Sequence, residues 1–547
     1  MRTPGRAPLS RRIGDPSMKR RTLLRGAGAL VAGTLARPAL VRAASATTLK
    51  FVPYADLALL DPIITTNYVT RTHALMVFDT LYSLDSGYRA QPQMVAGHQV
   101  SDDGLTWQLT LRDGLRFHDG TPVLARDVVA SLKRWALRDA YGGALFATVD
   151  ALTAPSDTVV TFRLKRPFPL LPDALAKPTS YLPAIMPERL STIPATQAVS
   201  EIVGSGPYRY VPDERVPGSL NVYRRFESYR PREGGTPSFT AGPRIAHFDR
   251  VEWRTIPDGA TAAGALRSGE IDWWEQPLVD LVPDLLRQPA VRVDLVETAG
   301  LIGQIRLNHT LPPFDNPAIC RALLSAVDQA EMMDAVAGSD AAIRRGPAGV
   351  FTPGGPMASE AGLGALTGPR DLSAAKRALA EAGYKGERVV LLAGTDVPRI
   401  NAICEVMADL CRKLGMNVDL VATDWGTVNQ RILSPKPLDQ GGWSMFGIFS
   451  GGLDHLSPAY HLVIRGNGRA GVPSWQTDTA LEELRSAWFA APDHASQKAV
   501  AARIQARVLE IGAYIPCGQY FQPTAYRRDL EGMLTGLPLF WNLRRSA

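Results

Sequence analysis

The sequence has few cysteines and no long hydrophobic run. Four of its 547 residues are cysteine, too few for a dense disulfide framework. Cys404 and Cys411 fall seven positions apart on a predicted helix, about 10.5 Å along its axis, which exceeds the reach of a disulfide. We expect all four thiols to be free and buried. No stretch approaches the ~18 consecutive apolar residues of a transmembrane helix, so we expect none.

Catalytic signatures are absent as well. The chain contains no G-x-S-x-G turn, no H-E-x-x-H, no Walker A loop and no C-x-x-C. One G-x-G-x-x-G occurs over 466–471, but Val472-Pro473 follows where a dinucleotide site needs a helix. The closest pair among the eight histidines, His455 and His461, is six positions apart, which predicts different faces of a helix or strand. We expect neither an enzyme nor a cofactor.

The positive charge of the chain is confined to its first segment. The formal net charge is +7, and residues 1–46 hold ten basic residues against one acid, a balance of +9. Subtracting this balance from +7 leaves −2 for the other 501 residues. A nearly neutral protein has no broad field that would attract nucleic acid or anionic lipid. We therefore expect no nucleic-acid partner, and specificity that comes from a local pocket.

The first 46 residues have the features of an export signal. A basic region precedes an apolar run from Gly26 to Ala36, and small residues then provide A-x-A-like cleavage sites at 41–43 or 44–46. Residues 19–24, Lys-Arg-Arg-Thr-Leu-Leu, resemble the twin-arginine export motif. We expect export by that route, cleavage, and a periplasmic protein that is not lipid-anchored, because no lipobox-like cysteine follows the apolar run. Translation could begin at Met1 or at Met18, and both remain open.

Residues 101–164 are rich in strand signals separated by Asp-Gly turns. Alternation of apolar and polar residues predicts strands at 107–112 and 158–164, and helical spacing predicts a helix at 126–138 between them. Strands and a helix in this order predict a compact α+β unit.

Beyond Gly303 strands and helices alternate, which predicts βαβ units and a largely parallel sheet. The predicted strands are 305–308, 389–392 and 418–421, and the predicted helices are 318–336, 372–382, 398–414, 480–490 and 495–512.

Aromatic side chains are frequent in the irregular segments. They are Tyr68, Trp273, Trp274, Trp425, Trp443, Phe446, Phe449, Trp475 and Trp541. A buried core explains such residues one at a time, whereas aromatics that converge in space would line a ligand pocket. The sequence alone leaves both interpretations open.

Several longer motifs resemble one known family. They include Ser-Asp-Asp-Gly-Leu-Thr-Trp at 101–107, Leu-Arg-Asp-Gly-Leu-Arg-Phe-His-Asp-Gly-Thr-Pro at 111–122, and Gly-Ser-Gly-Pro-Tyr at 204–208. Asn308 through Pro312-Pro313-Phe314 and Tyr514-Ile515-Pro516 extend the match along the chain. In these residues the sequence closely resembles the family 5 extracellular solute-binding proteins, the peptide, opine and nickel-type receptors of ABC importers.

The resemblance implies an α/β, two-lobed periplasmic-binding-protein fold, with an extra α+β domain inserted in the first lobe and two hinge crossings. Applied to this chain, it places domain I at 47–80, 200–298 and 516–547, domain II at 81–199, and domain III at 299–515. Such proteins work by hinge closure around a ligand, which requires no covalent chemistry.

The function implied is that of a periplasmic receptor, a monomer, that delivers a peptide or similar small polar organic solute to ABC permease subunits and their ATPases. Two alternatives keep the fold: binding of a metal chelate or haem, and a chemosensory receptor. A third alternative from another class, a secreted hydrolase, lacks any recognisable nucleophile arrangement.

The resemblance also implies a set of ligand-contacting positions. The candidate residues are Tyr68, Trp274, Glu275, Gln276, Leu301, Gly303, Trp425, Arg431, Phe449, Ser450 and Asp454. Relatives place a Gly-Trp pair, and soon after it an Asp that pairs with a peptide's α-amine, where this chain has Phe449 to Asp454. Asp454 takes that role if the alignment shifts by about one residue. Which of Glu275 and Asp454 contacts the ligand stays open.

Overall fold

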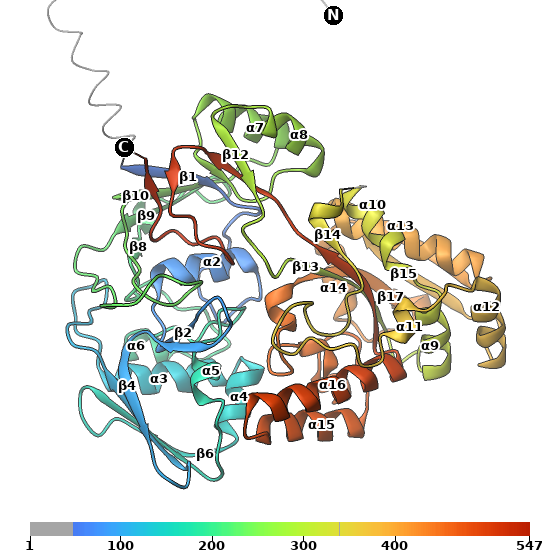
Figure 1. Cartoon of the computed structure of the whole chain (residues 1–547), viewed down its shortest axis with the longest axis horizontal. Coiled ribbons are helices and arrows are strands. Elements are labelled where there is room, and N and C mark those ends of the chain that lie inside the picture. Colours follow the sequence, from blue (N-terminus) through green and yellow to red (C-terminus); the bar gives the residue numbers. More distant parts are fainter. Residues whose placement is uncertain (1–46, 339, 547) are drawn as a thin grey trace, which may run out of the picture. The chain divides into compact units, whose positions relative to one another are not determined.

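The computed structural model describes residues 47–338 and 340–546 (Figure 1). The predicted export signal, with its twin-arginine motif and cleavage sites, lies outside the described residues. Across the described part of the chain, no helix combines the length and apolar character needed to cross a membrane. All four cysteines are free and buried, which confirms the prediction made for them.

A seven-stranded sheet collects segments from both ends of the chain. Its strand order is β12-β19-β11-β1-β10-β9-β8. The central strand β1 runs parallel to β10 and β11, and the other pairings are antiparallel. The strands are β1 (Thr48–Val52), β8 (Tyr208–Tyr210), β9 (Leu220–Arg225), β10 (Arg250–Arg254), β11 (Trp273–Trp274), β12 (Val291–Asp294) and β19 (Thr524–Arg527).

Aromatic packing holds this sheet together. Phe51 on β1 lies between Trp253, Trp273 and Phe540, with ring centroids 5.4, 4.8 and 4.9 Å away. All four side chains are buried. Large rings in such tilted and edge-on contacts add to the stabilisation that burial already provides. The chain segments that supply this sheet also form three helices, α2 (Tyr68–Val77), α7 (Gly259–Ser268) and α8 (Val282–Leu286).

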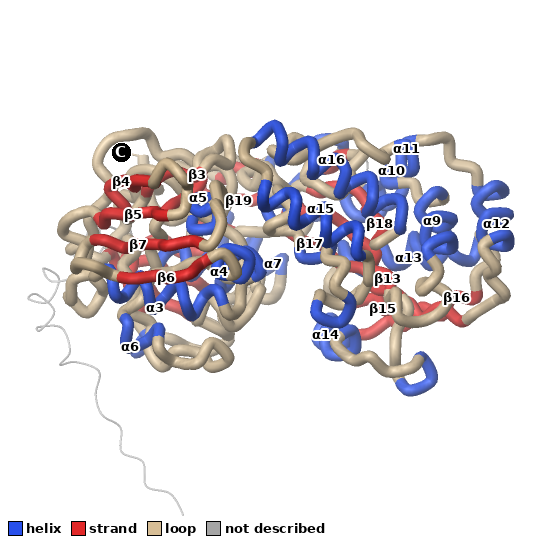
Figure 2. Tube along the Cα trace, turned by 90° about the horizontal axis from the view of Figure 1, so that it is seen from below, coloured by secondary structure: helices blue, strands red, loops and turns tan. Residues whose placement is uncertain are grey.

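A four-stranded antiparallel sheet, β4-β5-β7-β6, forms the α+β unit (Figure 2). It consists of β4 (Val95–Val100), β5 (Thr106–Leu111), β6 (Val149–Thr153) and β7 (Val159–Leu164), with helices α3 (Ala125–Ala136), α4 (Ala140–Phe146), α5 (Leu171–Leu175) and α6 (Glu188–Ser191) and the short pair β2 (Tyr82–Leu84) and β3 (Ala90–Pro92). The two predicted strands and the predicted helix are confirmed to within two residues. On β5, alternate residues from Trp107 to Leu111 are buried, as the pattern requires.

A six-stranded sheet follows, in the order β14-β18-β13-β17-β15-β16. Its strands are β13 (Leu301–Leu307), β14 (Arg344–Arg345), β15 (Arg388–Gly394), β16 (Asn417–Thr423), β17 (Met445–Gly451) and β18 (Tyr514–Tyr520). Only β15 is parallel to its neighbours, β16 and β17, so the prediction of a largely parallel sheet is wrong. The physical reason is that β13 pairs with β17 and β18, both of which run opposite to it, and element order alone does not reveal those partners.

The helices of this part are α9 (Pro317–Ser325), α10 (Gln329–Ala337), α11 (Gly364–Thr367), α12 (Leu372–Glu381), α13 (Pro398–Lys413), α14 (Trp425–Ile432), α15 (Thr479–Ala490) and α16 (His494–Ile511). The single helix predicted at 318–336 is wrong, because α9 ends at Ser325 and α10 begins at Gln329. Asp328 accepts hydrogen bonds from the Ala330 and Glu331 amides and so starts a new helix. The other predicted helices are confirmed. The short strands β20 (Leu530–Glu531) and β21 (Arg544–Arg545) complete the fold.

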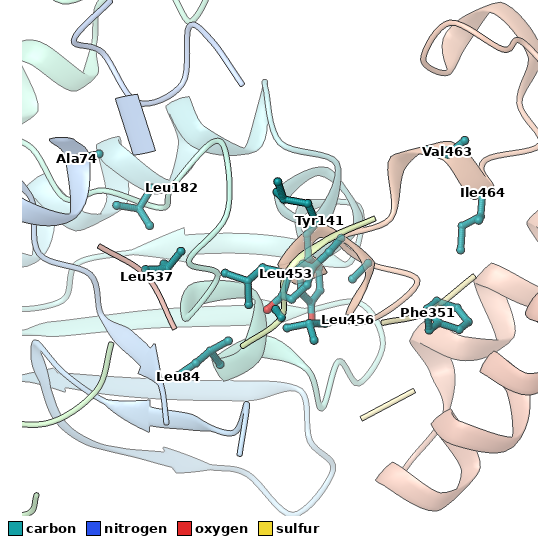
Figure 3. Close-up of a cluster of buried hydrophobic side chains, with 14 of the residues drawn as sticks. Ala74, Leu84, Tyr141, Leu182, Phe351, Leu453, Leu456, Val463, Ile464 and Leu537 are labelled. Carbon is teal, nitrogen blue, oxygen red and sulfur yellow. The ribbon is translucent and has the colours of Figure 1, made fainter. Parts of the chain in front are cut away.

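Apolar side chains of the α+β unit contact residues that come after β17 of the six-stranded sheet in the sequence. Figure 3 shows Tyr141 of α4 beside Leu453 and Leu456. The Tyr141 ring centroid also lies 5.7 Å from that of Tyr460 and 5.9 Å from that of Phe489 on α15. Sequence segments that are more than 300 positions apart therefore share one buried cluster.

Candidate ligand-binding site

Tyr68, the first residue of α2, makes two short hydrogen bonds to the segment around the end of β17. Its hydroxyl donates to Asp454 Oδ2 at 2.5 Å and accepts from the Gly451 amide at 2.6 Å. Helix α2 itself packs on the seven-stranded sheet, where His73 Nδ1 lies 2.8 Å from the Tyr223 hydroxyl. Tyr68 therefore connects a helix of the seven-stranded sheet with the end of a strand of the six-stranded sheet.

Glycine at position 452 lets this segment approach the chain just before β13. The Gly452 amide donates to the Gly300 carbonyl at 2.7 Å. A Cβ atom on Gly452 would lie 1.9 Å from the Ala299 carbonyl oxygen, which no side chain tolerates. The close contact fixes the 3-10 turn η5 (Gly452–His455), and with it the position of the Asp454 carboxylate.

Six charged side chains surround Tyr68 and its neighbour Tyr54. They are Arg71 on α2, Glu275 after β11, Glu297 between β12 and β13, Arg306 on β13, Arg399 on α13 and Asp454 on η5. Arg71 acts on the pKa values of both tyrosines and of all three acids. Both tyrosines raise the lowered pKa of Arg399, and Tyr68 does the same for Arg306. These six groups therefore lie within electrostatic range of one small region.

None of the six forms a salt bridge within residues 47–338 and 340–546. Arg71 is only 5% exposed, and its guanidinium lies over the Tyr68 ring, 4.6 Å from the centroid. The Nε atoms of Arg71 and Arg399 are buried and have no hydrogen-bond partner in the described structure. Buried charges are usually paired because removing them from water is costly. Six charged side chains without a salt bridge in one region make it the candidate ligand site of the described structure.

Burial raises the pKa of each of the three acids of the site. Burial raises the pKa of Glu275 to about 7, against the opposing effects of the Tyr54 amide, which donates to Oε2 at 2.8 Å, and of Arg71. Burial likewise raises the pKa of Glu297 to about 7. For Asp454 burial also raises the pKa, while the Tyr68 hydroxyl, Arg71 and Lys177 oppose the rise. A cation among these carboxylates would favour their ionised form.

The basic groups divide into two sets. Arg71 lies among the three acids. Burial lowers the pKa of Arg306 to about 10 and lowers that of Arg399, and the neighbours that oppose this are tyrosines, not carboxylates. Arg306 Nε donates to Gln304 Oε1 at 2.7 Å. The site therefore has an acidic part around Arg71 and a basic part around Arg306 and Arg399.

Five predicted residues lie along or beside β13 and β17. The two strands are antiparallel, with Gly303 opposite Phe449 and with Leu301 opposite Gly451. A Cβ atom on Gly303 would lie 3.1 Å from the Phe449 ring, so the ring covers this glycine. Ser450 follows on the same strand, one residue before the amide that Tyr68 binds. The structure thus brings these strand residues to the same end of the sheet as Asp454.

The predicted ligand residues at and just after the end of β11 have different surroundings. Glu275 joins the charged group described above, and Gln276 beside it is half-buried. Trp274 instead packs into an apolar cluster with Val52 and Leu266. Its ring is part of the core of the seven-stranded sheet.

Two predicted residues lie apart from the charged group. Arg431 donates from Nε and Nη2 to the Gly441 and Gly442 carbonyls, at 3.1 and 3.0 Å. Trp425 packs against Gly394, where a Cβ atom would lie 3.0 Å from its ring. A ligand role for these two remains a prediction without support from the geometry.

The other aromatic candidates form core clusters. Trp443 packs against Phe446 and Trp475, with ring centroids 5.1 and 5.5 Å away, and Trp541 is fully buried beneath Arg244. Of the two interpretations left open by the sequence, burial in a core therefore holds for these four rings. Tyrosines supply the aromatic part of the charged site instead.

Sequence reasoning missed Tyr54, Arg71, Glu297, Arg306 and Arg399. Arg306 had a usable signal, because it stands in a stretch whose other residues are mostly apolar, whereas Arg71 stands among Thr70, Thr72 and His73. A charged residue in such a stretch is either paired or functional. Glu297 and Arg399 come from a connecting segment and a helix start, which gave no local signal.

The histidine pair contradicts its prediction. The rings of His455 and His461 lie with centroids 4.0 Å apart, because the turn between them folds the chain back. His455 Nδ1 and Nε2 lie near the Val350 carbonyl and Gln304 Nε2, and His461 Nε2 lies 3.1 Å from the Tyr514 hydroxyl. The described residues contain no group of three or more His, Cys, Asp or Glu suited to a metal ion.

Comparisons with known proteins agree on one family. The family described as "Bacterial extracellular solute-binding proteins, family 5 Middle" matches residues 89–461. A probable peptide ABC transporter periplasmic-binding protein, y4tO of Sinorhizobium fredii, is 33% identical over 97% of this chain and 100% of its own length.

Solved structures share the fold. The periplasmic binding protein DppA of Helicobacter pylori, in complex with the peptide STSA, superposes with a TM-score of 0.75 at 19% identity, covering 93% of this chain and all of its own. The PBP AgaA of A. tumefaciens R10, in complex with agropinic acid, gives 0.74 at 21% identity, covering 91% and 99%. The periplasmic-binding-protein fold is thereby confirmed, and the chain belongs to the family 5 bacterial extracellular solute-binding proteins.

Proposed function

We propose that this protein is a periplasmic receptor of an ABC importer that captures a peptide or similar small polar organic solute between two lobes and delivers it to the membrane permease. It is exported by the twin-arginine route, cleaved, and acts as a monomer. Domain I comprises 47–80, 200–298 and 516–547, domain II is 81–199, and domain III is 299–515.

The observation that carries the proposal is the group of six charged side chains that form no salt bridge among the described residues. A zwitterionic solute would supply the missing partners, its cation at the acidic part and its carboxylate at Arg306 and Arg399. Asp454 is the proposed partner of an α-amine. The peptide complexes and the peptide-transport relative among the similar proteins support this choice of solute class.

Hinge closure is the proposed motion. Domain I supplies Tyr68, Arg71 and Glu275, and domain III supplies Arg399 and Asp454, so a solute in the site contacts both lobes. The two hydrogen bonds of Tyr68 join the lobes directly. Closure around the solute then stabilises the form that the permease recognises.

A thermal-shift screen of the processed protein tests the proposal. The panel contains di- and oligopeptides, opines, sugars, amino-acid derivatives and metal chelates. Binding to the native state alone raises the unfolding midpoint through RT ln(1 + [L]/Kd), so a zwitterionic peptide or derivative should raise it by several degrees. The proposal fails if only sugars or metal chelates raise the midpoint.

A further inference from the structure

A chain of buried hydrogen bonds joins the basic part of the site to the turn that carries Asp454. Arg306 Nε donates to Gln304 Oε1 at 2.7 Å, and Gln304 Nε2 lies 2.9 Å from His455 Nε2. His455 Nδ1 in turn lies 3.2 Å from the Val350 carbonyl oxygen. Gln304 and His455 are both buried and are 151 positions apart in the sequence. The chain therefore connects β13 with η5.

Arg306 sets the direction of every bond in this chain. A guanidinium only donates, so the Gln304 oxygen accepts from it and the Gln304 amide nitrogen donates to His455. His455 Nε2 is then the acceptor and carries no proton. The proton is on Nδ1, which donates to the Val350 carbonyl. A neutral His455 in this one tautomer completes the chain.

The turn η5 is held at both of its ends. Thr352 Oγ1 donates to the Gly452 carbonyl at 2.5 Å, and the Thr352 amide donates to the His455 carbonyl at 3.1 Å. The His455 side chain adds the bond to Gln304. Asp454 lies between these two ends, and its Oδ2 accepts from Tyr68 at 2.5 Å. The position of the Asp454 carboxylate therefore depends on what holds His455.

Arg306 uses only its Nε atom in the chain. Its two Nη atoms have no hydrogen-bond partner within the described residues, and neither atom is fully buried. A guanidinium binds a carboxylate through two parallel hydrogen bonds, which require a set orientation of its plane. The bond from Nε to Gln304 restricts the rotation of that plane and leaves the Nη atoms available.

We propose that Gln304 and His455 are positioning residues, which hold Arg306 and Asp454 at a fixed separation so that one solute is bound by its carboxylate and its amine at the same time. The inference rests on the proposed function and adds to the site two residues that act through others. Its consequence is a preference for solutes that carry both charged ends, and this preference depends on the bond between Gln304 and His455.

Peptides that differ only at the carboxyl end test this role. The probes are alanine di- and tripeptides, each as the free acid and as the C-terminal amide, and titration calorimetry on the processed protein measures their affinities. We expect the wild type to bind the free acid about tenfold more tightly than the amide, the usual scale of a hydrogen bond to a charged group. Gln304→Leu removes the acceptor for Arg306 and should reduce this preference to about threefold or less.

His455→Phe breaks the same chain at its other end and should reduce the preference to a similar extent. Because the two residues act through one bond, the double variant should lose no more of the preference than either single variant. The preference is a ratio measured on one protein, so a general loss of stability cancels. Circular dichroism verifies folding, and each single variant tests the chain independently of the other.

Gln329→Leu is the matched control. Gln329 is also buried, and its amide group bonds to the backbone of Ala348 and Pro516 but not to Arg306. Its replacement should reduce stability and leave the preference for the free acid unchanged.

The outcomes separate the two claims. If peptides bind but the preference is absent from the wild type, or is unchanged in Gln304→Leu and His455→Phe, the positioning role is overturned and the receptor function stays intact. An equal loss of preference in Gln329→Leu also overturns it. If no peptide binds to the wild type, the proposed function fails and the inference fails with it.

Discussion

At the scale of single residues, Tyr68 links the two sheets through one hydroxyl group. Tyr68→Phe removes both the donor to Asp454 and the acceptor for the Gly451 amide. The loss of these two hydrogen bonds should destabilise the closed form by about 1–3 kcal/mol. This is equivalent to about a 5- to 150-fold loss of affinity for any solute. Titration calorimetry with the tightest solute from the screen measures the loss.

Tyr384→Phe is the matched control for this change. Its hydroxyl also makes two hydrogen bonds, donating to the Glu387 carbonyl and accepting from the Asn417 amide, and none of the six charged side chains of the site acts on its pKa. It should leave affinity unchanged. Equal affinities for the Tyr68→Phe variant and the wild type would show that the contact plays no part in closure.

The buried histidine pair predicts sensitivity to acid. Burial lowers the pKa of His455 from about 6.5 to about 3 and that of His461 well below its usual value, with Arg306 and Arg485 opposing any added charge. The folded state thus binds fewer protons than the unfolded state below pH ~6.5. His455 should therefore remove about 1.4 kcal/mol of stability for every unit that the pH falls from 6.5 towards 3, and His461 acts in the same direction.

Urea unfolding at pH 7, 6, 5 and 4 measures this effect. His455→Gln cannot be protonated and should lose less stability than the wild type between pH 6.5 and 4. Glu275 and Glu297 act in the opposite sense, since a raised carboxyl pKa adds stability below pH ~4.5 that is lost as the pH rises towards 7. Parallel curves for the variant and the wild type would contradict the account of the pair.

At this scale the sequence predicted part of the site. Glu275 and Asp454 are members of the charged group, and Phe449 covers Gly303 beside it. Arg431 and Trp425 are bound elsewhere, because backbone carbonyls and a glycine surface provide partners that a motif does not reveal. Arg71 and Arg399 become recognisable only when the structure shows that they have no partner.

At the scale of elements, Asp328 begins α10 shortly after α9 ends at Ser325. Asp328 caps α10 by accepting from the Ala330 and Glu331 amides. Asp328→Ala should therefore destabilise the protein by about 1 kcal/mol, the usual value of an N-cap side chain. Chemical denaturation measures the change.

The exposed Asp315, shortly before α9, provides the comparison for this cap. No side-chain hydrogen bond is found for it within the described chain. Asp315→Ala should leave the free energy of unfolding unchanged to within about 0.5 kcal/mol. If both variants lose the same stability, the cap is not what starts α10.

The existence of a helix could be predicted from the sequence where hydrophobic periodicity coincides with capping residues. Asp371 accepts from the Ala374 amide at the start of α12, and Gly383 has a φ of +90° just after its end, as the sequence suggested. Strand pairing was not predictable, since β13 lies between two strands that are respectively about 140 and 210 positions away. Local patterns carry no information on such distant partners.

At the scale of the whole molecule, the positive net charge comes from residues 1–46, the proposed export signal. Their balance of +9 leaves −2 for the rest of the chain, so no broad field would contribute to recognition. Replacing Arg20 and Arg21 together by lysine should stop export by the twin-arginine route, with the precursor remaining in the cytoplasm. Cell fractionation with immunoblotting measures this distribution, and unchanged processing would point to the general secretory route.

The most direct test of the central claim is the affinity of Asp454→Asn for the tightest peptide, compared with that of the wild type by titration calorimetry. Asparagine still accepts from Tyr68 but lacks the charge that would pair with an α-amine. We predict one peptide per protein for the wild type and at least a tenfold weaker affinity for the variant. Absence of peptide binding to the wild type, or equal affinities for the two proteins, would contradict the account.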